Sequence, residues 1–121
     1  MAEHTKNNSQ ADEELPPTLF ERIEEAVQIA QDLSLPPTAY NESEMLNDEL
    51  VPALFGARTY IEVGQITEPE VHAGLARALR IAFHLADMNR KYNTLVNRLR
   101  ILLEDADRIA HDTREMENRR P

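Results

Sequence analysis

The residues best suited to chemistry lie near the C-terminal end of the chain, where acids and a histidine could share one face of a helix. Glu104, Asp107 and His111 follow at helical spacing, and Asp112 comes directly after the histidine. Carboxylates and imidazoles arranged in this way inside a helical bundle can hold a divalent metal ion. The spacing departs from the Glu-x-x-His pattern of such sites, and the N-terminal half offers acids but no matching histidine. We therefore expect no metal site and no cofactor.

Other catalytic chemistry has little support in the sequence. The chain has no cysteine, which removes thiolate nucleophiles, thiolate metal sites and disulfide bonds together. His4, His72 and His84 have no neighbour suited to nucleophilic catalysis. The three glycines do not form a phosphate-binding loop. We expect a protein without catalytic residues.

Composition indicates one small helical domain. The chain has 121 residues, of which 41% are hydrophobic and only 5% aromatic, with no tryptophan. Such residues build a helical bundle more readily than a broad core around a deep pocket. The N-terminus is polar and acidic, and no apolar run reaches the roughly 20 residues that a bilayer requires. We expect an intracellular protein with no membrane segment.

Charge divides the chain into two unlike halves. The net charge is −9, but residues 1–65 carry thirteen acids against three bases, whereas residues 66–121 carry nine acids against ten bases. Within the second half, Arg77, Arg80, Lys91 and Arg98 are expected on one sector of a helix, where they could dock an acidic surface. The acidic overall charge would repel nucleic acid at long range, so we do not expect nucleic acid as a partner.

The first two parts of the chain are predicted to be a tail and a pair of short helices. Residues 1–16 hold almost no apolar side chains, so we expect a disordered acidic tail. Residues 17–66 predict one amphipathic helix that opens at Pro17-Thr18 and ends near Leu33. A second helix is expected around Met45 to Phe55, with Pro-rich connectors and a capping box at Asn41-x-x-Glu44. Pro52 predicts a kink or two abutting helices. Residues 59–63 have a strand-like composition but no strand to pair with, so we expect a helix end or extended connector that stops at Gly64.

The third part, residues 67–118, is predicted to be one long heptad-patterned helix. Thr67 is the expected N-cap, in a capping box with Glu70. If unbroken, the helix would be a rod of roughly 70 Å. A turn at residues 87–93, giving a helical hairpin or bundle, is the alternative, since this segment is polar. The predicted partner interface is the heptad seam: Val71, Leu75, Ala78, Ala82, Leu85, Asn89, Tyr92, Val96, Leu99, Leu103, Ala106 and Ala110.

Taken together, these patterns predict an all-α protein that acts through partners. Asn89 would fix the register of a coiled coil if it lies in the seam, or mark a turn if it does not. The favoured hypothesis is a non-catalytic scaffold subunit that assembles with itself or with other helical proteins, its short helices folding back on the long one or docking onto a partner. The alternative is an acidic inhibitor or mimic that binds a basic site on a nucleic-acid-binding protein. Its acidic surface would consist of Glu13, Glu14, Glu21, Glu24, Glu25, Asp48 and Glu49.

Overall fold

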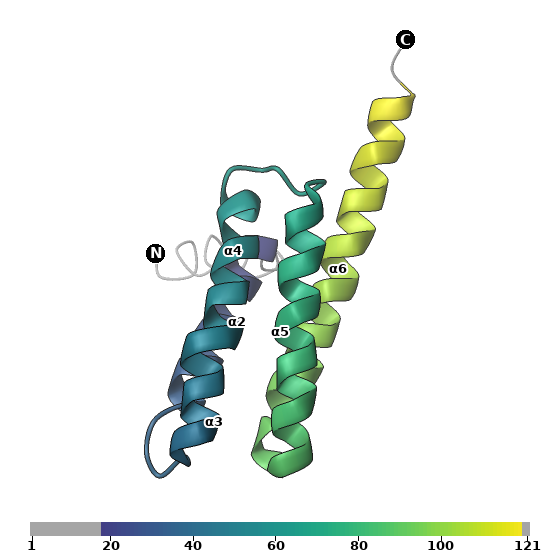
Figure 1. Cartoon of the computed structure of the whole chain (residues 1–121). Coiled ribbons are helices and arrows are strands. Elements are labelled where there is room, and N and C mark those ends of the chain that lie inside the picture. Colours follow the sequence, from purple (N-terminus) through teal and green to yellow (C-terminus); the bar gives the residue numbers. More distant parts are fainter. Residues whose placement is uncertain (1–17, 120–121) are drawn as a thin grey trace, which may run out of the picture.

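The computed structural model, which describes residues 18–119, is all-helical and contains no strand within that range (Figure 1). Four rods run alternately up and down. The first is α2 (Leu19–Leu33), and the second consists of α3 (Tyr40–Met45), η1 (Leu46–Leu50) and α4 (Val51–Glu62) in succession. The third is α5 (Pro69–Met88) and the fourth is α6 (Asn93–Asn118), with a short 3₁₀ turn, η2 (Arg90–Tyr92), between them. Contacts join α2 to α4, α4 to α5, α5 to α6 and α6 back to α2. The rods therefore close into a four-helix bundle, which confirms the predicted all-α class. The predicted tail, residues 1–16, lies outside the described residues.

The start of α2 and the end of α4 lie at the predicted positions, and each is determined by a nearby residue. Thr18 caps α2 in a reciprocal capping box, in which its hydroxyl accepts from the Glu21 amide and the Glu21 carboxylate accepts from the Thr18 amide. Gly64 follows the end of α4 with a φ of 79°, a left-handed conformation that glycine adopts without strain. The predicted start of the first helix and the predicted stop at Gly64 are thus confirmed.

Two other predicted caps do not form. The Thr67 capping box was wrong, because Glu68 occupies the N-cap of α5 and Pro69 is the first helical residue. The Asn41 capping box was also wrong, because α3 already begins at Tyr40 with Ala39 as its N-cap. Neither helix start has a side-chain cap; α5 begins at Pro69, whose fixed φ suits the first helical position.

Pro52 changes the second rod without breaking it. The five residues before Val51 form a π turn, η1, in which the Val51 amide donates to the Leu46 carbonyl. A proline ring clashes with the carbonyl four residues earlier, here that of Asp48, and the wider turn accommodates it. The two predicted short helices therefore abut as expected, but in one continuous path. The strand-like residues 59–62 belong to α4, in agreement with the helix-end alternative.

The chain turns at Asn89, so the unbroken helix predicted over residues 67–118 was wrong and the alternative, a turn at residues 87–93, is confirmed. This residue is extended, with φ −154° and ψ 127°, and its side chain accepts a hydrogen bond from the Lys91 amide. An asparagine that satisfies backbone amides in this way competes with the helix and favours a cap or turn. α5 and α6 are consequently an antiparallel hairpin, and the roughly 70 Å rod does not exist. Asn89 is exposed, so it does not set the register of a buried seam.

The apolar seam predicted for a partner is instead the centre of this bundle. Twenty-one buried residues from α2, η1, α4, α5, η2 and α6 form one continuous core, and no polar residue is buried in the described part of the chain. Tyr92 is the largest side chain in it, with no exposed surface. Folding the second half back on itself thus removes the apolar stripe from water within a single chain.

Candidate interaction surfaces

The predicted partner-interface residues divide into three groups by position. Leu103 is half-buried at the edge of the core and Asn89 is exposed in the turn. The other ten are buried: Val71, Leu75, Ala78, Ala82, Leu85, Tyr92, Val96, Leu99, Ala106 and Ala110. These ten side chains contact the chain's own helices, so a partner would reach them only after the bundle opened. A surface for partners must be sought on the outer faces of the rods.

The four basic residues predicted to dock an acidic surface also separate. Arg98 on α6 forms an ion pair with Glu25 on α2, and the Lys91 ammonium donates to the Thr38 hydroxyl at 2.6 Å. Arg77 and Arg80 lie exposed on α5 and form no ion pair within residues 18–119. The turn at Asn89 thus removes the single basic stripe, and half of its members hold the bundle together.

A polar latch of two side-chain hydrogen bonds lies at the end of the bundle where α5 turns into α6. Its members are Lys91 with Thr38, and Tyr92 with Glu42. The Tyr92 hydroxyl donates to the Glu42 carboxylate at 2.7 Å, next to the Lys91–Thr38 bond. Burial, and then the hydrogen bond to Glu42, raise the pKa of the Tyr92 phenol far above its usual value. The latch joins α3 to the α5–α6 turn, segments that lie some fifty residues apart in the sequence.

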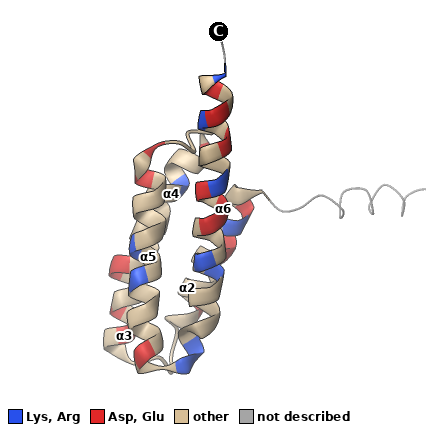
Figure 2. Cartoon of the chain, turned by 90° about the vertical axis from the view of Figure 1, so that its right-hand side faces the viewer, with Lys and Arg blue, Asp and Glu red and all other residues tan. Residues whose placement is uncertain are grey.

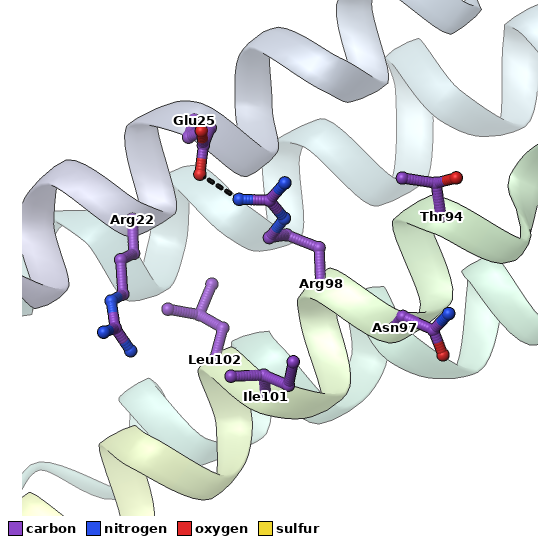
Figure 3. A pocket seen from close by; sticks show the side chains of 7 residues that line it. All are labelled: Arg22, Glu25, Thr94, Asn97, Arg98, Ile101 and Leu102. Carbon is purple, nitrogen blue, oxygen red and sulfur yellow. Dashed lines mark hydrogen bonds and ion pairs between the residues drawn. The ribbon is translucent and has the colours of Figure 1, made fainter. Parts of the chain in front are cut away.

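A solvent-open groove of about 460 Å³ runs between α2 and α6 (Figure 3). Two inter-helical ion pairs cross near it, Arg98 with Glu25 and Arg22 with Asp105. Its apolar part is supplied by Leu102, which is almost fully buried, and by Ile101, which is 51% exposed. The lining residues come from both helices: Arg22, Glu25, Thr94, Asn97, Arg98, Ile101 and Leu102. The sequence pointed only to Arg98 and Glu25 among them, and for two different surfaces, because a single-helix pattern does not show which two faces will border a groove.

A second, smaller hollow of about 330 Å³ lies between the start of α5 and the later turns of α6. The His72 Nδ1 lies 2.9 Å from a carboxylate oxygen of Asp107, and the Arg114 guanidinium donates to the Thr67 carbonyl at 2.9 Å. Both His72 and Asp107 are about half exposed. Asp107 therefore pairs with a histidine on α5 and not with His111, its predicted neighbour in a metal site.

Within residues 18–119, no three histidine, cysteine or acidic side chains gather where they could hold a metal ion. The helices of this part of the chain also include none that is both long and apolar enough to span a membrane.

The acids predicted for the mimic hypothesis are partly neutralised by the fold. Glu24 pairs with Arg58 and Glu25 with Arg98, while Asp48 remains exposed on η1. Glu13 and Glu14 lie outside the described residues. The free acidic surface of α2 is therefore smaller than the sequence indicates.

The chain has no recognisable counterpart in the comparisons with known proteins. No family model matches it, and neither the curated proteins nor the solved structures include a significant match. Its class is thus defined by the fold alone: a four-helix bundle with an open groove between its first and last helices.

Proposed function

We propose that this protein is a non-catalytic helical interaction subunit, which assembles with itself or with other helical proteins through the outer face of α2 and α6. The observation that supports the proposal is the groove between these helices, where Ile101 lies half exposed beside polar and charged residues. The core of the bundle is complete without this side chain, so packing within the chain does not explain an isoleucine at this position.

The composition of the groove resembles that of a small protein interface. Interfaces combine an apolar centre with a polar rim, and the rim excludes water from the contacts at the centre. Here Ile101 and Leu102 would be the centre, while Thr94, Asn97 and the Arg98–Glu25 pair would be the rim. A helix laid into the trough between two helices is a common way for such a surface to be covered. The predicted helical interface is thereby moved from the buried seam to the exterior.

The proposal is tested by the molar mass of the purified chain in solution. We would measure light scattering on a sizing column at two salt concentrations, for the parent and for Ile101→Arg. Val63→Arg is the matched control, since Val63 is also an exposed aliphatic residue but lies beyond the end of α4, away from the groove. Self-assembly that Ile101→Arg abolishes and Val63→Arg leaves intact is the expected result.

A monomeric parent requires a second measurement. Proteins captured from the native source would be identified, and each would be purified and titrated against the parent and Ile101→Arg. If no purified protein binds the parent more tightly than Ile101→Arg, the proposed function is refuted.

A further inference from the structure

The charges of α6 and the turn before it divide sharply at Ile101. Residues 90–100 contain four bases and no acid, whereas residues 101–118 contain six acids against two bases. Figure 2 shows the consequence, with basic residues near the start of the helix and most of the acidic ones along its later turns. The net charge is therefore +4 over the η2 turn and the first turns of α6, where Arg98 and Arg100 supply the two bases of the helix itself, and −4 over the rest of α6. The half-exposed Ile101 lies at the boundary.

This arrangement is unfavourable for the helix itself. The partial positive charge at a helix N-terminus favours acids there, and the partial negative charge at the C-terminus favours bases. α6 has no acid in its first turn and no base in its last turn, where Glu115 and Glu117 lie; its nearest base at that end is the C-cap residue Arg119. Intrahelical electrostatics therefore do not explain why the charges are distributed in this order.

Contacts within the bundle leave many of these charges free. Arg98, Asp105 and Asp107 are paired with residues of α2 or α5. In contrast, Arg90 and Arg100 on the basic side form no ion pair within residues 18–119, and neither do Glu104, Asp112, Glu115 and Glu117 on the acidic side. All six are exposed.

An exposed stripe connects the two halves on the outside of α6. Its members recur at steps of three and four residues, and all of them are exposed: Thr94, Asn97, Ile101, Glu104, Arg108, Asp112 and Glu115. Positions at this spacing lie above one another on one face of a helix. α6 also extends past the other rods at its C-terminal end (Figure 1).

We infer that the partner on this face is a second copy of the chain, whose α6 lies antiparallel to the first across a two-fold axis at Ile101. This inference rests on the proposed function and names its partner. The antiparallel orientation places the +4 segment of each helix over the −4 segment of the other, whereas a parallel pair would place like charges together. A two-fold interface requires a face that is complementary to itself, and here the unpaired bases beside the first half of the stripe, Arg90 and Arg100, would meet the acids of its second half.

The axis also determines which residues meet. Glu104 follows Ile101 by three residues and Arg98 precedes it by three, so Glu104 of one copy lies opposite the Arg98–Glu25 pair, and close to the unpaired Arg100, of the second copy. By the same count Asp112 lies opposite Arg90. The two Ile101 side chains meet at the centre and cover each other's exposed half. With one apolar contact and several exposed ion pairs, the dimer should be salt-sensitive and in exchange with its monomer.

A charge-swap experiment tests this arrangement. Glu104→Lys with Asp112→Lys makes α6 more basic, and Arg90→Glu with Arg100→Glu makes it more acidic; none of the four residues takes part in an ion pair of the bundle. We expect each double variant to dimerise at least about tenfold more weakly than the parent at low salt. An equimolar mixture of the two should form a heterodimer, because each helix then meets one of opposite charge.

A matched control changes charge elsewhere on the molecule. Arg77→Glu with Arg80→Glu reverses two exposed, unpaired bases on α5 and should leave the dimer intact. Sedimentation over a concentration series gives the dissociation constants, and far-ultraviolet circular dichroism verifies that each variant keeps the helix content of the parent.

The outcomes separate this inference from the proposed function. If the parent dimerises but the α6 variants dimerise equally well, or their mixture forms no heterodimer, the α6 pairing is refuted while the self-assembling subunit stands. A parent that stays monomeric over the whole concentration series also refutes the pairing, and the titration of purified partners against Ile101→Arg then decides the proposed function.

Discussion

At Gly74, α5 packs so closely against α4 that a side chain has no room, and this contact provides a test of how the bundle is packed. A Cβ atom at this position would lie 2.7 Å from the Ala53 carbonyl oxygen and 3.1 Å from the Ala57 Cβ. Real Cβ atoms essentially never come as near to another atom as the first distance, and the atom met is backbone, which cannot rotate away. Gly74→Ala should therefore push α4 and α5 apart, at a cost of about 1–3 kcal/mol for overpacking.

Gly74→Ala should also stabilise the helix itself, and this gain in stability must be separated from the steric cost. Alanine in place of glycine inside a helix stabilises by roughly 0.5–1 kcal/mol, because less backbone entropy is lost on folding. Gly56 supplies the control, since it lies within α4 and a Cβ there has nothing within 4 Å. Gly56→Ala should show the gain alone, so the difference between the two variants isolates the steric cost.

Urea unfolding followed by circular dichroism at a helical wavelength measures both free energies of unfolding. We expect Gly56→Ala to be more stable than the parent and Gly74→Ala to be less stable than Gly56→Ala by about 1–3 kcal/mol. A difference of 1 kcal/mol corresponds to a shift of roughly 4–8 °C in midpoint temperature for a domain of this size. If Gly74→Ala is as stabilising as Gly56→Ala, the close α4–α5 approach is absent in solution and the reasoning is refuted.

Three further predictions concern the latch, the core and the first cap. Tyr92→Phe should lower the free energy of unfolding by about 1–2 kcal/mol, since the Glu42 carboxylate loses its donor. Because folding raises the pKa of Tyr92, the unfolded chain loses the phenol proton at lower pH than the folded chain does. The protonated phenol therefore contributes its full stabilisation below about pH 10, and this contribution declines at higher pH. Tyr92→Phe should remove that decline when the free energy of unfolding is measured against pH in the alkaline range. Leu99→Ala should cost about 2–5 kcal/mol, whereas Ile101→Ala should cost less than about 1 kcal/mol in the monomer; equal losses in urea unfolding would contradict the assigned burial. Thr18→Ala should cost about 0.5–2 kcal/mol, and Thr18→Asp, which keeps a capping oxygen, should recover most of that loss in the same assay.

Much of the local structure was predictable because it depends on neighbours in the sequence. The start of α2 at Thr18 rests on a capping box that spans four residues, and the stop at Gly64 rests on the backbone freedom of one residue. The buried stripe of α5 was predictable for the same reason, because helical periodicity marks the apolar face whatever later covers it. All of these are properties of a few adjacent residues.

The candidate surface was not predictable in the same way. Ile101 lies outside the predicted heptad seam, and only the packing of α2 against α6 shows that this exposed residue borders a groove. Likewise, Arg98 was predicted to dock a partner, but its charge is met by Glu25, seventy-three residues earlier in the chain. A one-dimensional pattern identifies an apolar or basic face, and it does not identify the neighbour that covers that face.

By itself the sequence determined that this chain is helical, where its first helix begins, and which side chains avoid water, since these follow from propensity, capping and periodicity. Only the tertiary structure decided whether the second half would be a rod or a hairpin. The heptad pattern through Asn89 is compatible with both, because an apolar stripe can be covered by another chain or by the same one. The chain turns at Asn89 because folding back buries Leu85, Tyr92 and Leu99 against the chain's own helices. The free energy gained by this burial depends on residues that are far away in the sequence.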